Sequence, residues 1–396
     1  MKKLGQICIA LVILLIFTVE LNNILQKKIE KYYNDSISVL YNNDVKNMGV
    51  ILQREAIKRG NLMFYGSSEL GAHIEQNPKS FFPNDKINKV VNPIGRGFVQ
   101  ELQHAINFGA VSQNLKNSRP VFFISMTWFM EDIGNKGVTP EHFLMNFSEL
   151  QFLEAMENKN LSKELKKNIC SRVGSLVKKD KNYKDVSMYC KLYNSNNMLT
   201  KIGFYMLKPY FALDKLILKT KDNIQAYNLI KRTPRNNFNM NNPEKINWKD
   251  EYIKAIAQGK EESKNNQFNM QDYCFEKFYK NYIPKIKHLV KQMDPLNSIE
   301  YNDLDILLKT CKESKIKPLF IIIPVNGVWY DYLGLPKEKR YSFYDKVEKI
   351  INNAGFDILD FRQKEYEKYF MIDGVHLGWK GWLNTNEAIA NYFKKN

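Results

Sequence analysis

The chain has 396 residues, 44% of them hydrophobic, which is enough to bury the core of one large domain or two small ones. Its 59 Lys and Arg residues outnumber its 42 Asp and Glu residues, so the formal net charge is +17 at pH 7. Such an excess attracts polyanions, among them an anionic membrane surface or cell-wall polymer, whereas the lack of a helix-turn-helix, zinc-finger or RNP signature argues against nucleic acid.

The first expected element is an apolar helix at the N-terminus. Lys2 and Lys3 precede an apolar run over 7–19, and with its flanks this segment reaches the roughly 20 residues that a membrane-spanning helix needs. The run alone would also suit a signal peptide, but no small-x-small cleavage site follows it. We therefore expect an uncleaved anchor over 1–28 and, because a hydrophilic body follows it, an extracytoplasmic domain over 29–396.

Short apolar runs bounded by turn residues predict buried strands. They cover residues 62–65, 89–91, 121–125, 319–324 and 357–361. Helical patterns lie between them, so we expect a parallel sheet covered by helices on both faces, a three-layer α/β/α, flavodoxin-like fold.

The pattern changes between about 139 and 317. Pro140 suits the first position of a helix, and long helical stretches rich in Lys and Glu follow. A polar tract over 235–243 separates two of these stretches and predicts a surface loop. We interpret 139–317 as a helical insertion into the sheet domain.

The cysteines do not suggest a metal site. They are Cys8, Cys170, Cys190, Cys274 and Cys311. None forms a Cys-x-x-Cys pair, which argues against zinc, and we expect neither a metal nor a cofactor. An exported chain is able to form disulfides from the last four, but small buried thiols are the simpler interpretation.

Two segments at opposite ends of the chain carry the parts of a catalytic triad. The first predicted strand runs into a Gly-Ser-Ser turn that is able to expose Ser68 at the edge of the sheet. Near the C-terminus, Asp373 lies three residues before His376 on a loop that follows the last predicted strand. A serine hydroxyl needs a base within hydrogen-bond reach, and the base needs an orienting partner. Since the carboxyl ends of parallel strands meet at one edge, we expect these groups to converge.

Two further segments follow predicted strands. The turn over 92–97 ends in Gly97 and is able to aim backbone N–H groups at a developing oxyanion. Thr127 lies directly after the third strand, within Ser125-Met126-Thr127-Trp128. Ser, Gly, a third strand-end element and Asp-x-x-His, in this order, resemble the four blocks of the SGNH hydrolase superfamily.

The resemblance is more specific to the DltD family of D-alanyl-lipoteichoic acid biosynthesis proteins. It is carried by residues 64–70, 324–330 and 373–382, and it covers essentially the whole chain. The resemblance implies that Ser68 is the nucleophile, His376 the base and Asp373 its orienter, with the Ser68 and Gly97 amides in the oxyanion hole. The third block departs from the family, because Thr127 stands where Asn or Gln is usual, and a hydroxyl has a shorter reach.

Substrate-binding residues are expected beside these loops. Trp128 and Trp379 are candidates for the wall of a site that holds a lipid, glycerol or sugar unit, or they pack the loops. Arg96 and Lys380 either pair with substrate phosphate or are surface residues at the rim of the site without a role in binding. The sequence leaves both alternatives open.

The resemblance implies a membrane-anchored serine acyltransferase or esterase in D-alanylation of teichoic acid, in the envelope of a Gram-positive cell. It implies a D-alanyl donor, a teichoic acid acceptor and a membrane-embedded acyltransferase partner of the Dlt system. An SGNH-type carbohydrate O-acetyltransferase or esterase is one alternative, because it uses the same catalytic parts. A non-catalytic scaffold that binds teichoic acid is the other.

Overall fold

The computed structural model describes residues 2–84, 90–115, 119–132, 135–236, 238 and 246–395. Its main sheet has five parallel strands in the order β2-β1-β3-β6-β7. These are β1 (Leu62–Tyr65), β2 (Val91–Ile94), β3 (Val121–Ser125), β6 (Leu319–Ile323) and β7 (Asp357–Asp360). A separate antiparallel pair consists of β4 (Glu131–Asp132) and β5 (Asn135–Lys136).

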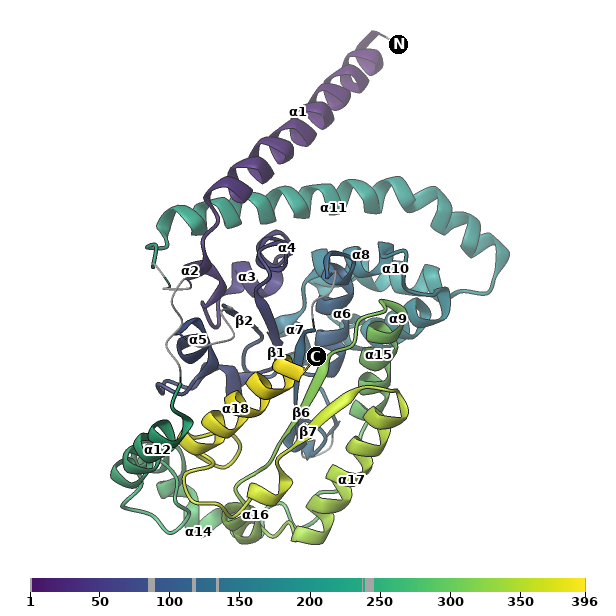
Figure 1. The fold of residues 1–396 in the computed structure, drawn as a ribbon. Helices are drawn as coiled ribbons and strands as arrows, with labels where there is room; N and C mark the ends of the chain where they lie inside the picture. Colours follow the sequence, from purple (N-terminus) through teal and green to yellow (C-terminus); the bar gives the residue numbers. More distant parts are fainter. Residues whose placement is uncertain are drawn as a thin grey trace.

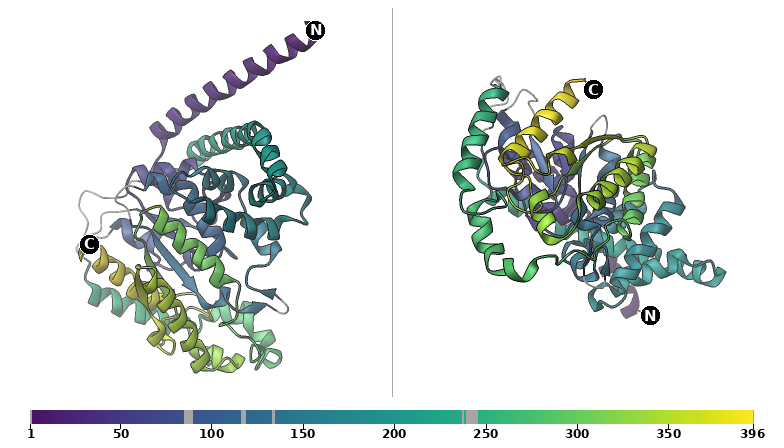
Figure 2. Two further views of the ribbon diagram at one scale, coloured as in Figure 1. Left: turned by 90° about the vertical axis from the view of Figure 1, so that its right-hand side faces the viewer. Right: turned by 90° about the horizontal axis from the view of Figure 1, so that it is seen from below.

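Helices cover both faces of the main sheet, as Figures 1 and 2 show. Alternate strand residues point to opposite faces, so Phe122 and Phe320 enter one core while Phe123 and Ile321 enter the other. The first core is closed by α4 (Ile51–Lys58), α6 (Glu101–Val111), α15 (Glu300–Glu313) and α17 (Lys337–Asn353). The second is closed by α5 (Pro78–Phe81), α12 (Trp248–Glu262) and α18 (Trp379–Lys395). The α/β class expected from the sequence is confirmed.

The second strand differs from its expected position. The sequence predicts it over 89–91, with Asn92 and Pro93 in the turn; residue 89 lies outside the described residues, and β2 continues through Pro93 to Ile94. The strand tolerates Pro93 because β2 is at the edge of the sheet and pairs with β1 alone.

The region between β5 and β6 is helical. Its helices are α7 (Pro140–Asn146), α8 (Glu149–Glu157), α9 (Lys163–Val177), α10 (Lys184–Asn194), α11 (Met198–Arg232), α12, α13 (Asp272–Cys274), α14 (Ile283–Ile286) and α15. Two of these helices, α12 and α15, pack on the sheet itself, so the sheet domain includes part of the segment interpreted as an insertion. Most of the polar tract over 235–243 lies outside the described residues.

Helix α1 (Lys2–Tyr32) extends away from the body at its N-terminal end (Figure 1). The segment Ile9–Tyr32 is long and apolar enough to cross a membrane, with a hydropathy of 2.0. The last turns of the same helix pack on the body, where Leu25 and Ile29 are buried. The expected anchor boundary at residue 28 therefore falls inside a continuous helix.

Candidate active site

Ser68 lies in a tight turn at the carboxyl end of β1. A short 3-10 helix, Ser68–Gly71, begins at this residue, and Ser68 is exposed. The neighbouring Glu69 is buried, and its Oε1 accepts a hydrogen bond from the Ser67 N–H at 2.6 Å. A Cβ on Gly66 would lie 2.3 Å from that oxygen, so a larger residue here would displace the Glu69 carboxylate. Glu69 and Gly66 together hold the backbone that presents Ser68.

Asp373 and His376 lie on a compact loop after β7. The Asp373 Oδ1 accepts hydrogen bonds from the backbone N–H groups of Val375 and His376, both at 2.8 Å. The N–H of Ile372 donates to the His376 carbonyl at 2.9 Å, which closes the loop. The carboxylate therefore fixes the backbone of the histidine that it also contacts through its second oxygen.

The structure brings Ser68, His376 and Asp373 together. The His376 Nε2 lies 2.8 Å from the Ser68 Oγ, and its Nδ1 lies 2.7 Å from the Asp373 Oδ2. Asp373 is buried, whereas the His376 side chain is 26% exposed. With Nδ1 protonated toward the carboxylate, Nε2 is free to accept the serine proton.

The charges around the imidazole favour its protonated form. Burial alone would lower the pKa of His376, but the charge and hydrogen bond of Asp373, with a contribution from Glu69, outweigh it and hold the pKa above its usual value. Burial alone would raise the pKa of Asp373, but His376 and the two amide donors hold it below its usual value. The pair thus stabilises the ion that forms when a serine proton is taken up.

The turn after β2 packs directly against the nucleophile turn. Gly95 has a φ of +141°, and a Cβ there would lie 1.8 Å from the carbonyl oxygen of Gly66. The Ser67 hydroxyl donates to the Arg96 carbonyl at 3.0 Å and joins the two turns. Gly97 follows on this turn with open space around its Cα. The turn that carries the expected oxyanion donor is therefore placed by Gly95, which the sequence analysis did not single out.

Thr127 lies in a 3-10 turn, Met126–Trp128, directly after β3. Its hydroxyl lies 2.9 Å from the Ser125 hydroxyl, and in the described part of the chain this is its one side-chain hydrogen bond. The structure thus places Thr127 at the expected strand end, where its hydroxyl pairs with Ser125 and, among the described residues, forms no hydrogen bond with the triad.

Arg96 and Lys380 are both engaged within the protein. The Arg96 guanidinium forms an ion pair with Asp44 and donates to the Asn146 Oδ1 at 2.6 Å. Lys380 forms an ion pair with Glu367. Each cation already has a carboxylate partner, so the geometry favours bracing of the loops over capture of a substrate phosphate.

The tryptophans near the loops are in the core. Trp379 is 0% exposed and Trp128 is 7% exposed. A side chain without accessible surface has none to offer a substrate in this conformation, so the loop-packing interpretation accounts for Trp379. Trp128 packs against His104 at a ring distance of 6.0 Å. The burial of both side chains favours the loop-packing alternative.

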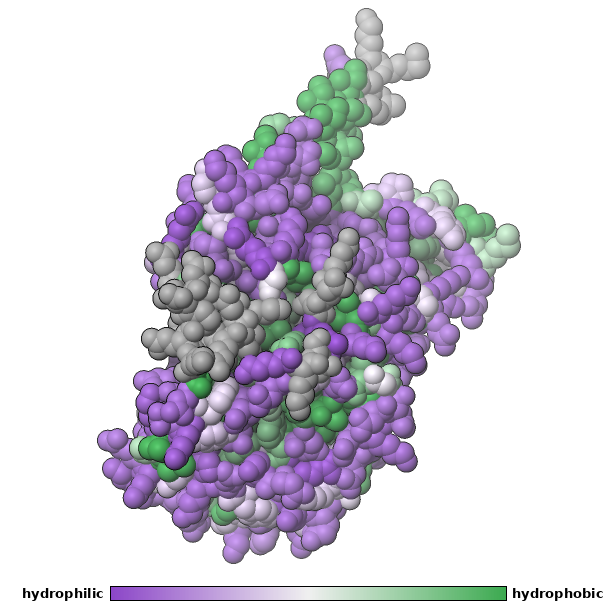
Figure 3. All heavy atoms as spheres, viewed as in Figure 1, coloured by the Kyte–Doolittle hydropathy of each residue, from purple (hydrophilic) through white to green (hydrophobic). Residues whose placement is uncertain are grey.

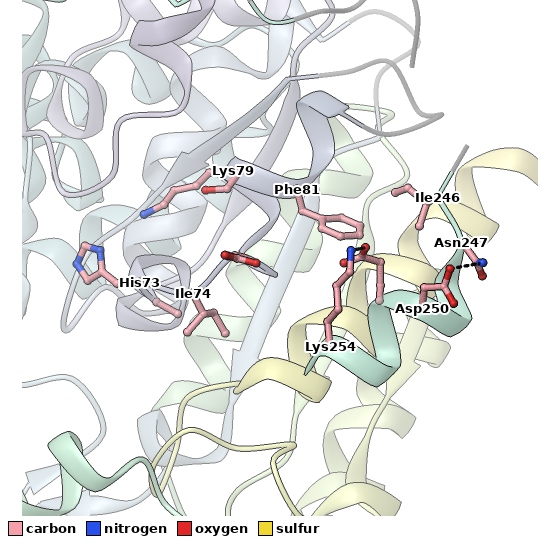
Figure 4. A pocket seen from close by; sticks show the side chains of 12 residues that line it. His73, Ile74, Lys79, Phe81, Ile246, Asn247, Asp250 and Lys254 are labelled. Carbon is pink, nitrogen blue, oxygen red and sulfur yellow. Dashed lines mark hydrogen bonds and ion pairs between the residues drawn. The ribbon is translucent and has the colours of Figure 1, made fainter. Parts of the chain in front are cut away.

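A cavity of about 830 Å³ lies beside the nucleophile turn, between α5 and α12. His73 and Lys79 lie at one end of it and Asp250 at the other, as Figure 4 shows. The ammonium group of Lys79 lies 5.6 Å from the ring of Tyr41, and the Tyr41 hydroxyl donates to the carbonyl of Ser67 at 3.2 Å. The cavity wall is thereby connected to the turn that carries the nucleophile candidate.

A buried ion pair stabilises the segment that leads into the loop that carries Asp373. Arg340 on α17 and Glu365 are each 0% exposed in their side chains, and they meet at 2.9 Å. The carbonyl of Glu365 accepts from the N–H of Gly327, at the start of α16 (Gly327–Leu333), at 2.8 Å. The N–H of Asn326 donates to the carbonyl of Gly374 at 3.0 Å. These contacts join the strand end of β6 to the loop after β7.

One of the described cysteines lies near the triad, because burial and then the negative charge of Asp373 raise the pKa of the Cys274 thiol to about 11. Cys170, Cys190, Cys274 and Cys311 are free, and the first two and the last are buried. In the part of the chain that the structure describes, no group of three or more His, Cys, Asp or Glu side chains is arranged to hold a metal ion.

The fold and the site define an α/β protein with a hydrogen-bonded Ser–His–Asp chain at the carboxyl edge of its parallel sheet. The family model described as DltD protein matches residues 39–394. A relative named Protein DltD from Bacillus subtilis (strain 168) is 32% identical over 349 residues, which cover 87% of this chain and 86% of the relative. Another Protein DltD, from Staphylococcus aureus (strain NCTC 8325 / PS 47), is 30% identical over 344 residues, which cover 83% of this chain and 80% of the relative. A third, from Lacticaseibacillus rhamnosus, is 23% identical over 357 residues, covering 87% and 80%. The chain belongs to the DltD family.

Proposed function

We propose that this chain is a membrane-anchored serine acyltransferase or esterase that acts in D-alanylation of teichoic acid. Its membership of the DltD family supports a role in that process. The single observation that carries the serine mechanism is the 2.8 Å contact between the Ser68 Oγ and the His376 Nε2, with Asp373 on the other ring nitrogen.

In the first half-reaction, His376 takes the proton of the Ser68 hydroxyl as its oxygen attacks the carbonyl carbon of a D-alanyl ester or thioester. The carbonyl oxygen becomes an oxyanion, and the backbone N–H groups of Ser68 and Gly97 are its proposed donors. The bond to the leaving group then breaks, and the leaving oxygen or sulfur takes the proton from His376. The product is a D-alanyl ester of Ser68.

In the second half-reaction, an acceptor hydroxyl of the polymer gives its proton to His376 and attacks the ester carbon. The bond to the Ser68 Oγ breaks, and that oxygen recovers the proton. Water in place of the polymer hydroxyl gives hydrolysis by the same steps, so access of the acceptor decides between transfer and hydrolysis. The exposure of Ser68 suits a large polymeric acceptor.

The proposed setting is the outer face of a cell membrane, with residues 29–396 as the extracytoplasmic body. A net charge of +17 suits a polyphosphate acceptor through long-range attraction, although lysines scattered over helix surfaces are a sufficient source of the charge. A membrane-embedded acyltransferase of the Dlt system is the proposed partner, and α1 lies in the same bilayer. No cofactor is needed for either half-reaction.

The test compares turnover of D-alanyl and acetyl esters by the purified full-length chain in detergent. We expect hydrolysis of D-alanyl esters to exceed that of acetyl esters, and Ser68→Ala to abolish it. Ser67→Ala is the matched control, because it removes a neighbouring serine hydroxyl that bonds to Arg96 and leaves the triad intact. A preference for acetyl esters would favour the carbohydrate O-acetyl alternative, and equal activity in Ser68→Ala would refute the serine mechanism.

A further inference from the structure

Helix α11 carries an apolar stripe along its outer side. Apolar residues recur along it at intervals of three, four or seven, so they share one helix face. Six of them are between 42% and 78% exposed: Leu199, Ile202, Met206, Leu213, Ile217 and Ile224. We call these six residues the α11 stripe. Six apolar side chains exposed on one face of a single helix differ from the scattered surface hydrophobics of a soluble protein, so the stripe indicates a partner.

The opposite side of α11 is fixed to the body. Asp222 is buried, and its carboxylate accepts hydrogen bonds from the backbone N–H groups of Val50 and Ile51 at 2.9 and 3.0 Å. Ala226 is buried on the same side. Ile224 lies two residues from both Asp222 and Ala226, and two residues of an α-helix turn through about 200°. The stripe therefore faces away from the body.

Helix α11 meets α1 where the apolar run of α1 gives way to polar residues. The Asn22 side chain donates to the Thr220 hydroxyl at 2.7 Å and accepts from the Asn223 side chain at 2.6 Å. On the N-terminal side of this crossing, Ile9–Val19 is apolar and largely exposed. If α1 crosses a bilayer, the crossing point with α11 falls at the headgroup level. Figure 1 shows α11 running along the side of the body from which α1 emerges.

The composition of α11 fits an anionic lipid surface. Seven Lys or Arg residues stand against two Asp residues in its sequence. Tyr205 is exposed beside the stripe, and aromatic side chains with a polar tip are enriched at the membrane interface. By the 100° that each residue turns in an α-helix, Lys221 and Arg232 lie beside the face of the stripe and Lys231 lies on it, and basic side chains at the edge of an apolar face are typical of helices that lie in the plane of the interface.

We infer that α11 is an in-plane membrane helix whose stripe lies among the headgroups and upper acyl chains of the bilayer that α1 crosses. Helices of this kind bury their apolar face about 5–10 Å into that boundary. Figure 3 shows the hydrophobic surface of α1, with further hydrophobic atoms at the far end of the α11 region. One spanning helix leaves a body free to rotate about it, whereas α1 and α11 together fix how the body sits on the membrane. The inference rests on α1 as a span and is independent of the chemistry of Ser68.

The test uses the full-length chain in vesicles of phosphatidylcholine and phosphatidylglycerol, without any other protein. A fluorophore is attached at Ile217→Cys in a background with Cys8→Ala and Cys274→Ser, which leaves only buried cysteines. Lipids brominated along their acyl chains quench a fluorophore that lies among them. Ile253→Cys on α12 is the matched control, because Ile253 and Ile217 are 59% and 56% exposed. Phe17→Cys on α1 reports insertion of the span.

We expect brominated lipids to reduce the fluorescence at positions 17 and 217 and to leave position 253 unchanged. Quenching at 17 with none at 217 beyond that at 253 would overturn the inference while leaving the anchor in place. Protection of position 217 from an aqueous quencher only after a membrane-embedded partner is added would also overturn it, since the stripe would then be a protein interface. None of these outcomes depends on acyl transfer, so they are separate from the test of the serine mechanism.

Discussion

At the scale of single residues, the proposed chemistry depends on the protonation of His376. The imidazole acts as a base only when neutral, so kcat/KM is expected to fall as the pH drops through the pKa of His376. Because Asp373 and Glu69 hold this pKa above its usual value, we expect the acid limb of the pH profile, where activity falls on acidification, to have its midpoint above the ordinary histidine pKa of about 6.5. A pH profile of ester hydrolysis measures the limb, and a midpoint below 6.5 would contradict this electrostatic account.

Glu69→Gln separates the charge of Glu69 from its structural role. Glutamine retains an oxygen for the Ser67 N–H but removes the negative charge beside the imidazole. We expect the plateau rate to change little and the acid limb to move to lower pH. Asp373→Asn is expected to cost about 10³–10⁴-fold in kcat, because it loses the charge and because one amide oxygen cannot accept from both the backbone N–H groups and the His376 Nδ1. An unmoved limb in Glu69→Gln would show that its charge does not reach His376.

Two glycines on one turn give a matched pair of substitutions. An alanine Cβ at Gly95 would lie 1.8 Å from the Gly66 carbonyl oxygen on a backbone with positive φ, whereas at Gly97 it meets open space. We expect Gly95→Ala to cost roughly 3 kcal/mol or more in the free energy of unfolding and to disrupt the nucleophile turn. Gly97→Ala should fold normally, because its Cβ would meet no other atom within 4 Å. Urea unfolding and ester turnover check both variants, and equal stabilities would refute the close approach.

The sequence reveals residues that belong to local motifs, but not residues whose role depends on a contact with a distant part of the chain. The proximity of Ser68, Asp373 and His376 was predictable because each lies in a short local motif at a strand end, and parallel strands bring those ends together. Gly95 was not distinguishable from Gly97, since its need for glycine arises from the carbonyl of Gly66, 29 positions earlier in the printed sequence. Burial of Trp379 was equally hidden, because it depends on how α18 packs on the sheet.

At the scale of elements, the buried Arg340–Glu365 pair joins α17 to the loop that carries the triad residues. Removing one partner of a buried ion pair leaves the other charge unpaired, which costs about 3–5 kcal/mol. We expect Arg340→Ala to lose stability by that amount, whereas Lys349→Ala, on the same helix and exposed, changes it by less than about 0.5 kcal/mol. The free energies come from urea unfolding. A loss below about 1 kcal/mol in Arg340→Ala would contradict the bracing role.

The three layers of the fold were predictable from the sequence, but which helices belong to each layer was not. Short apolar runs revealed β1 and β3 with their observed bounds, because a strand buried on both faces consists almost entirely of apolar residues. Pro93 concealed the end of β2, since a proline usually argues against a strand and only its position at the sheet edge permits it. The sequence also placed α12 and α15 in an insertion, because helical periodicity does not show which surface a helix covers.

At the scale of the whole molecule, the division between anchor and body is testable by truncation. Removing residues up to Glu20 keeps Asn22 and Leu25, whereas removing residues up to Lys28 deletes both and leaves Asn223 without its partner. We expect the shorter truncation to retain the stability of the body in detergent and the longer one to lose roughly 3 kcal/mol. Urea unfolding of both forms measures the difference. Equal stability would place the boundary at residue 28, as first expected from the sequence.

The most direct measurement of the central claim is covalent labelling of the full-length chain with a fluorophosphonate, followed by peptide mass spectrometry. We predict one adduct, on Ser68, that disappears in Ser68→Ala, falls strongly in His376→Ala and persists in Ser67→Ala. A wild-type chain that remains unlabelled would contradict the account and favour a non-catalytic scaffold, and an adduct on another serine would contradict the assignment of Ser68 as the nucleophile.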